Sequence, residues 1–230
     1  MEYDAEATVT FLREMAAGRL PFVTREGGGG RLTRYACGHL GCDLRPFNPV
    51  LAALPPFLHL RRKQGPPNFL DRLDGLTLEE GSTERPGSRS VGLRLIELAF
   101  VEVVRRHMET MPSDATGWLA GLRDPVAGRS LDLIHARPTE NWTLAGLAQE
   151  AAVSRTVLAE RFTHLVGWPP VRYLTRWRMQ LASGMLRDGA RVAEAAGVAG
   201  YTSEVAFSRA FKRETGSAPA GWRSMAIRAG

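Results

Sequence analysis

The chain has 230 residues, of which 44% are hydrophobic, and its formal net charge is +6 at pH 7. It is long enough to form one or two domains with a substantial core. No run of 18 apolar residues occurs, so we expect no membrane-spanning helix. The acidic start MEYDAEATVTF lacks a secretory pattern. These features predict a protein of the bacterial cytosol.

The positive charge is concentrated in the C-terminal part. Residues 1–136 carry 17 Lys or Arg and 17 Asp or Glu, whereas residues 137–230 carry 13 and 7. An excess of cationic side chains in one region indicates a polyanionic partner such as nucleic acid. The alternative is that an arginine-rich composition only reflects a GC-rich genome.

Two cysteines lie close together near the N-terminus. Residues 1–20 indicate a short helix or a frayed terminus, and Leu32–Leu40 indicates a strand. Cys37 and Cys42 then stand in CGHLGC, with His39 between them. Buried strand cysteines, a redox-responsive pair and a metal site are the three interpretations. Three close ligands without a fourth make a poor zinc site, so we expect no metal and no cofactor.

The next region changes from polar to strongly apolar. Residues 61–90 contain Pro and Gly clusters and predict a loop or linker, flexible at PGSRS, residues 86–90. The stretch VGLRLIELAFVEVVRRHMETM follows and predicts a helix that is apolar nearly all round. Such a helix is buried on two sides. Packing within its own domain and a dimer seam are the two interpretations, and we assign residues 89–112 as a candidate dimerisation helix.

Residues 113–230 predict a series of helices that contains one pattern twice. Short helices are expected at 118–122 and 126–136, before a first two-helix unit at about 143–166 and a second at about 191–215. In each unit a serine N-cap, Ser154 or Ser203, precedes an apolar seam. The caps are about 49 residues apart, which suits two units joined by one helix. The seams consist of Leu158, Phe162 and Leu165 in the first unit, and of Phe207, Ala210 and Phe211 in the second.

The connecting helix is expected over Arg172–Leu186, with one apolar face turned inward. That face comprises Leu174, Trp177, Leu181 and Met185. The first helix of the second unit contains small residues at Ala195, Gly197 and Ala199. Gly197 lowers helix propensity by about 1 kcal/mol relative to Ala. We therefore expect the second unit to be the less stable one.

At these residues the chain resembles the AraC/XylS transcriptional regulators. The matching segments are LAQEAAVSRTVLAERF, GWPPVRYLTRWRMQLASGML and GYTSEVAFSRAFKRETGSAPAGWR, within residues 142–222. The resemblance implies an all-α DNA-binding domain over 113–230 with two helix-turn-helix units and a long linker helix. It also implies double-stranded DNA and RNA polymerase as partners, a role as an activator and a homodimer.

More loosely, residues 1–88 resemble the cupin-type sensor domain of one branch of that family. The similarity rests on Cys37, Gly38 and the run NPVLAALPP. The 36 residues before Cys37 contain few strand-like runs, too few to close a barrel. We therefore expect a partial α+β cupin-like remnant without a complete ligand pocket, in a protein that is mainly α.

No catalytic constellation accompanies these motifs. The five histidines are scattered, and the glycines at 27–30 lack the lysine and serine of a phosphate-binding loop. A transcription regulator, an interaction module on the same fold and a small cupin-like enzyme are the three hypotheses. An interaction module needs an exposed apolar face where this chain has basic residues, and a cupin enzyme needs metal ligands. The sequence therefore favours the regulator, which is not an enzyme.

The two recognition helices are expected to read DNA by different chemistry. In the first, Glu160 can accept a hydrogen bond from cytosine N4, and Thr156 can contact a thymine methyl. In the second, Arg209 can reach guanine O6 and N7, whereas Lys212 and Arg213 suit phosphate or form a solvated basic face. The complete set of expected DNA-contact residues is Arg155, Thr156, Ala159, Glu160, Thr163, His164, Arg176, Ser203, Val205, Ser208, Arg209, Lys212 and Arg213.

Overall fold

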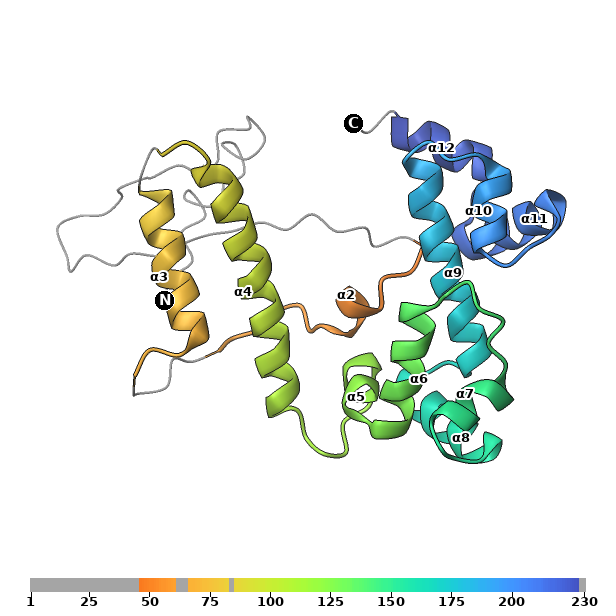
Figure 1. Cartoon of the computed structure of the whole chain (residues 1–230), viewed down its shortest axis with the longest axis horizontal. Helices are drawn as coiled ribbons and strands as arrows, with labels where there is room; N and C mark the ends of the chain where they lie inside the picture. Colours follow the sequence, from red (N-terminus) through yellow and green to blue (C-terminus); the bar gives the residue numbers. More distant parts are fainter. Residues whose placement is uncertain (1–45, 61–65, 83–84, 228–230) are drawn as a thin grey trace. The chain divides into compact units, whose positions relative to one another are not determined.

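A computed structural model describes residues 46–60, 66–82 and 85–227, and these residues form helices joined by short loops (Figure 1). The described part contains no β-strand. The chain divides into two compact units. The first comprises Met1–Gly41 and His59–His107, and the second comprises Cys42–Leu58 and Met108–Gly230. The predictions for residues 1–45, including the strand over 32–40 and the pair Cys37 and Cys42, lie outside the described residues.

In the first unit, α3 (Phe69–Gly81) occupies a region that the sequence predicted as a linker. That prediction is wrong because a strong local signal outweighs the neighbouring prolines. Asn68 accepts a hydrogen bond from the Asp71 amide at 3.1 Å, and the Asp71 side chain accepts one from the Asn68 amide at 2.9 Å. This reciprocal capping box satisfies two otherwise unpaired donors at the helix start.

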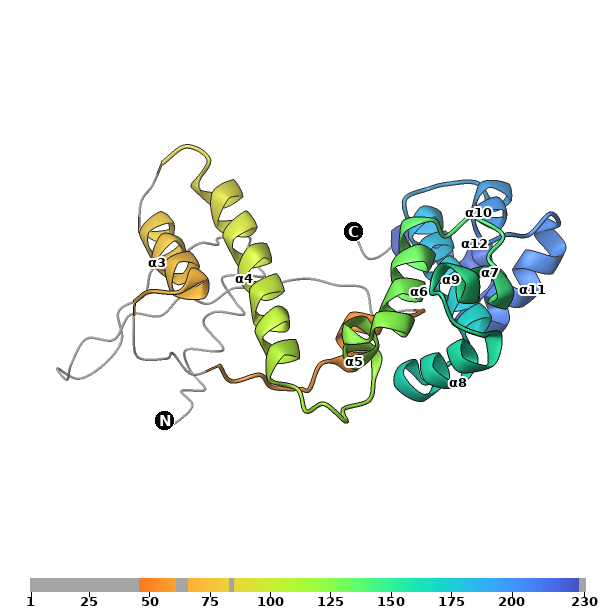
Figure 2. The ribbon, with the colours of Figure 1, turned by 60° about the horizontal axis from the view of Figure 1, so that its bottom comes forward.

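The long helix α4 (Ser88–Thr110) begins inside the segment that was expected to be flexible. Side-chain hydrogen bonds join α3 and α4 at both ends: Ser88 Oγ donates to Glu80 at 2.8 Å, and Arg106 donates to Asn68 at 2.7 Å. Figures 1 and 2 show the two helices side by side. Glu102, which is 8% exposed, pairs with Arg106 at 2.9 Å, so the covered face of α4 is partly polar.

The second unit is a bundle of short helices arranged along one long helix, α9. Pro170–Arg187 forms α9, which agrees with the predicted connecting helix. The short helices at 118–122 and 126–136 are also confirmed. The other helices are α2 (Pro49–Ala53), α5 (Trp118–Arg123), α6 (Pro125–Ala136), α7 (Leu144–Glu150), α8 (Arg155–Val166), α10 (Val192–Val198), α11 (Glu204–Thr215) and α12 (Pro219–Ile227).

Two separate hydrophobic cores lie along α9. Tyr173 and Leu174 belong to the first core, with Leu158 and Phe162 of α8. Further along α9, Met179, Ala182 and Leu186 belong to the second core, whose aromatic residues are Phe207 and Phe211 of α11. The helix therefore carries both two-helix units on one rigid rod.

The predicted inward face of α9 is only partly correct. Leu174 is buried, but Trp177, Leu181 and Met185 are half-buried. A single apolar stripe was expected, whereas α9 packs against two cores on different sides, so its buried set is wider. The fully buried residues of α9 outside the predicted face are Pro170, Tyr173, Met179, Ala182, Ser183 and Leu186.

Candidate nucleic-acid interface

The first two-helix unit is built around a tight turn between α7 and α8. The Val153 amide donates to Ala148 O at 3.0 Å, which closes the end of α7. Ala152 adopts φ 53°, a left-handed conformation that disfavours residues with a Cβ. Ser154 then caps α8 by accepting from the Val157 amide at 3.2 Å. The chain reverses within a few residues, which holds α8 across the end of α7.

The second unit repeats this turn between α10 and α11. The Tyr201 amide donates to Ala196 O at 2.9 Å, and Gly200 takes the left-handed position with φ 82°. Ser203 caps α11 by accepting from the Ala206 amide at 3.4 Å. The second turn has one additional residue before its cap. The two turns therefore share the same bond pattern although one uses alanine where the other uses glycine.

Both second helices have the same length and the same stop. Each contains 12 residues, and each ends at a left-handed glycine, Gly167 with φ 81° or Gly216 with φ 80°. The amides of these glycines donate to Thr163 O at 2.9 Å and to Lys212 O at 2.8 Å. Both predicted units thus form helix-turn-helix structures, with the predicted caps and stops.

Six of the predicted contact residues lie on α8, and four of the six are exposed. Arg155, Thr156, Glu160 and His164 are exposed, whereas Ala159 and Thr163 are half-buried. The sequence prediction missed Val157, which is 44% exposed. Helical spacing could have identified it, because it lies one residue before the buried seam residue Leu158.

Arg161 is the other exposed cation of α8, but it serves the fold. Its guanidinium pairs with Asp124 at 2.6 Å, and Asp124 also accepts from the Val126 and Ala127 amides at 3.0 and 2.9 Å as the N-cap of α6. Burial raises the pKa of Asp124, but these hydrogen bonds and Arg161 together lower it. This ion pair ties α8 to α6, so the face of α8 is close to neutral.

The outer face of α11 is markedly more basic. Val205 is 61% exposed, and Arg209, Lys212 and Arg213 are exposed around it. Ser203 is exposed and Ser208 is half-buried. Arg213 lies 4.0 Å from Glu214, whereas Arg209 and Lys212 have no ion pair within the part of the chain that the structure describes.

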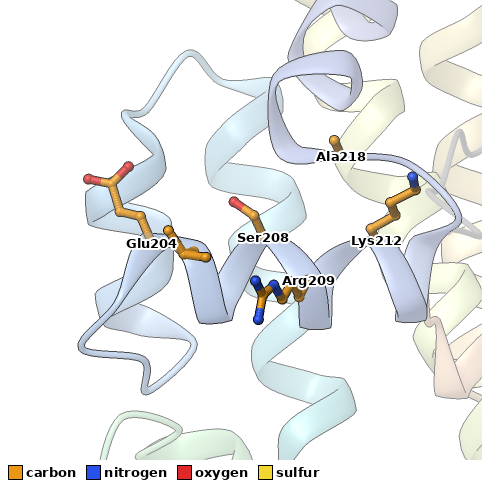
Figure 3. A pocket seen from close by; sticks show the side chains of 6 residues that line it. Glu204, Ser208, Arg209, Lys212 and Ala218 are labelled. Atoms are coloured by element: carbon orange, nitrogen blue, oxygen red, sulfur yellow. The ribbon is translucent and has the colours of Figure 1, made fainter.

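A shallow groove runs along this face of α11. Figure 3 shows Glu204, Ser208, Arg209 and Lys212 projecting from one helix, with Ala218 on the opposite side of the groove. Glu204 is an exposed acid at the helix start that the sequence prediction did not include. The groove therefore presents one carboxylate near its beginning and cationic groups along the rest.

Arg176 is placed differently from the other predicted contact residues. Its guanidinium lies 4.6 Å from the ring centroid of Phe47 and 4.2 Å from that of Trp168. Burial lowers the pKa of Arg176, with the carboxylate of Glu214 opposing this effect. A cation in contact with two rings contributes to packing. Arg176 is half-buried, and its expected DNA contact stays a prediction.

A buried polar cluster lies beneath the first helix-turn-helix. Trp118 Nε1 donates to the Tyr173 hydroxyl at 2.7 Å, and that hydroxyl lies 2.8 Å from His135 Nε2. The Tyr173 proton is then free to be donated to His135, which requires a neutral imidazole. Burial lowers the pKa of His135, and Asp132 opposes this effect. The cluster is satisfied internally and acts as part of the core.

Neither a metal centre nor a membrane-spanning helix is found in the ranges that the structure covers. The His, Cys, Asp and Glu side chains described there form no group of three or more able to hold a metal ion. No helix among the same residues is long and apolar enough to cross a bilayer.

Two capped helix-turn-helix units on one connecting helix, each with an exposed second helix, define a double helix-turn-helix protein. A family model described as a helix-turn-helix domain matches residues 147–225, and one described as a cupin matches residues 3–109. The chain belongs to the AraC family of regulators, in the branch with a cupin-type N-terminal domain.

Individual relatives agree with this assignment. The chain is 42% identical over 177 residues to a Streptomyces lividans protein named as an AraC-like transcription regulator, covering 76% of this chain and 58% of that one. It is 32% identical over 185 residues to the HTH-type transcriptional regulator AlkR of Acinetobacter baylyi, covering 79% and 60%. The chain thus spans less than two thirds of the length of these relatives. Their names are those of regulators, not of enzymes.

Among solved structures, the chain is similar to the DNA-binding domain of AdpA, a global transcriptional factor determined in complex with a target DNA. The two sequences are 32% identical, the TM-score is 0.41, and the match covers 44% of this chain and 92% of that domain.

Proposed function

We propose that this protein is a sequence-specific transcription regulator that inserts α8 and α11 into adjacent major-groove segments of a promoter. The observation that carries the proposal is the repeated turn, which presents two helices of equal length from one rigid α9. Helix-turn-helix units that share a face dock about 34 Å apart, one turn of the duplex. Regulation would then act through RNA polymerase, as the family resemblance implies.

The contact chemistry is proposed to differ between the two helices. Arg209 lies midway along the exposed face of α11, and its guanidinium suits the O6 and N7 atoms of guanine. Lys212 and Arg213 lie later in the same helix and suit phosphate oxygens. On α8, Glu160 suits cytosine N4 and repels phosphate, so it sharpens specificity while it lowers general affinity.

The test begins with selection of a preferred duplex from a random library by the purified protein. Binding of that duplex and of random DNA is then measured by fluorescence anisotropy for Arg209→Ala, Lys212→Ala and Glu160→Gln. We expect Arg209→Ala to lose about 1–3 kcal/mol on the selected duplex and to relax the preference at one base pair. Lys212→Ala should weaken all sequences alike and reduce the salt slope by about one unit. Glu160→Gln should strengthen binding to random DNA.

The matched control is Arg72→Ala, which removes one positive charge from α3. Arg72 is exposed and lies outside α4, α8 and α11, so its loss should leave both affinities unchanged. An equal loss for the selected duplex and random DNA in Arg209→Ala would refute base reading by that residue. Protection of a single groove segment in a footprint would refute the engagement of both helices.

We also propose that α4 forms a homodimer seam. Four of its apolar side chains, Val91, Leu93, Leu98 and Val101, are about half exposed, between 47% and 52%. Val101→Glu introduces a charge at an exposed position, so it should abolish dimerisation without disturbing the fold. Sedimentation velocity at increasing concentration measures this, and an unmodified protein that stays monomeric at tens of micromolar would contradict the seam.

A further inference from the structure

A short segment from the cupin-matched region is packed into the helix-turn-helix unit. Residues 46–53, here called the strap, fall within the cupin match at 3–109. By their contacts they belong instead to the second unit, as part of Cys42–Leu58, while the residues on both sides of that segment belong to the first unit. The segment that contains the strap is therefore joined at both ends to the unit of α3, but the strap packs within the unit that contains both helix-turn-helix structures.

Phe47 makes the central contacts of the strap, all of them with α9. Its amide donates to Gln180 Oε1 at 2.9 Å. Its ring meets the ring of Tyr173 edge-on, with centroids 5.5 Å apart, and the guanidinium of Arg176 lies over its face at 4.6 Å. The same guanidinium also lies over the ring of Trp168, at 4.2 Å from its centroid. Contacts of Arg176 thus link Phe47 of the strap and Trp168 of the loop after α8 to α9.

A local cap gives the strap a fixed shape. Asn48 accepts from the Leu51 amide at 3.1 Å and so starts α2, with the buried Pro49 at its first position. Proline suits this position because its missing N–H would be unpaired there anyway. A capped turn with a buried proline holds Phe47 in place against α9.

The strap lies where the two cores meet. A narrow cleft between them is lined by Pro46, Phe47, Arg176, Met179 and Glu214. Tyr173 belongs to the first core and Met179 to the second. Glu214, near the end of α11, pairs with Arg172 at the start of α9 at 2.7 Å, and its side chain is 10% exposed. The strap therefore touches the junction that fixes α11 relative to α8.

We propose that Phe47 is a positioning residue for DNA binding, because it holds the junction of the two helix-turn-helix units in one orientation. This proposal rests on the proposed function, in which α8 and α11 engage adjacent groove segments together. Two linked modules gain affinity over either module alone only when their geometry permits simultaneous engagement. The strap is continuous in sequence with the unit that contains α3. A change in that unit which displaces Phe47 would therefore loosen the junction between the two helix-turn-helix structures and weaken binding to two groove segments.

The first measurement needs no DNA. Spin labels on cysteines introduced at Gln149 of α7 and Ala193 of α10, two exposed positions outside the recognition helices, report the distance between the units by double electron–electron resonance. Cys37 and Cys42 are replaced by serine in every labelled protein. We expect a narrow distribution that broadens in Phe47→Ala and in Gln180→Ala. The second variant removes only the hydrogen bond to the Phe47 amide and so retains the core.

The second measurement compares two duplexes, the selected two-segment DNA and the same DNA with one segment scrambled. Phe47→Ala should lose about tenfold or more in affinity for the first and less than about threefold for the second, because only joint engagement depends on orientation. Phe57→Ala is the matched control, since it removes the same kind of ring from a side chain that is 78% exposed and lies outside the strap, within Cys42–Leu58. Phe57→Ala should leave the affinity for both duplexes unchanged.

The outcomes separate this proposal from the proposed function. An unchanged distance distribution in both Phe47→Ala and Gln180→Ala overturns the positioning role, as does an equal loss of affinity for both duplexes. If the unmodified protein does not prefer two-segment DNA, the proposed function fails. A broadened distribution would in that case still support the positioning of the units by Phe47.

Discussion

Two glycines in helices of the compact unit formed by Cys42–Leu58 and Met108–Gly230 predict opposite effects of the same substitution. Gly197 lies in α10, is exposed, and a Cβ added there would meet no atom within 4 Å. Alanine favours a helix over glycine by about 0.8–1.0 kcal/mol in a helix interior. Gly197→Ala should therefore stabilise the unit by somewhat less than about 1 kcal/mol, since the residue is near the helix end.

Gly128 in α6 provides the contrast. A Cβ at this position would lie 2.7 Å from the carbonyl oxygen of Leu122, which is backbone and cannot rotate away. Insertion of atoms into a packed site costs about 1–3 kcal/mol. Gly128→Ala should therefore destabilise the same unit, although alanine has the better helix propensity.

Thermal unfolding followed by circular dichroism at 222 nm measures both variants. For a unit of this size, about 1 kcal/mol corresponds to a few degrees in Tm. We expect a rise of a few degrees or less for Gly197→Ala and a clear fall for Gly128→Ala. A fall in Tm for Gly197→Ala would refute the reasoning that α10 is weakened by backbone freedom. A neutral Gly128→Ala would mean that α5 and α6 separate easily.

Two further variants concern the first helix-turn-helix and the core beneath it. Ala152→Gly should raise the free energy of unfolding by less than about 1 kcal/mol. Glycine removes the backbone strain at φ 53°, but its greater freedom in the unfolded chain offsets part of that gain. A lower free energy of unfolding in a urea titration would contradict this. Burial lowers the pKa of His135 in the folded protein below the unfolded value near 6.5. The stability that neutral His135 contributes is therefore fully present above pH 6.5 and is lost as the pH falls through the pKa of the folded state. Urea titrations should show a flatter pH dependence in His135→Gln, and parallel profiles would contradict the assignment.

The elements predicted best from the sequence are those with signals inside a single helix. Ser154 and Ser203 start α8 and α11, and the left-handed glycines end them, because caps and stops act on the nearest turn of backbone. The same reasoning was available for α3, whose capping box at Asn68 was overlooked beside the prolines. The exposed residues of α11 also follow from helical spacing once its phenylalanine seam is recognised.

Other properties depend on residues far apart in the sequence. Arg161 and Arg209 are both cationic residues of predicted recognition helices, yet Arg161 is paired with Asp124, the N-cap of α6. Arg176, a predicted DNA contact, lies over the rings of Phe47 and Trp168, and Phe47 is far from it in the sequence. The sequence contains these residues, but only the packed chain decides which cations remain available.

The sequence by itself determined the two helix-turn-helix units, their caps and their seams, since each is specified by interactions within a few residues. The tertiary structure decided that α9 joins two separate cores, and that the strap around Phe47 is packed at their junction. The physical reason is the length scale: hydrogen bonds of caps and turns are local, whereas burial and ion pairing depend on which distant surfaces meet.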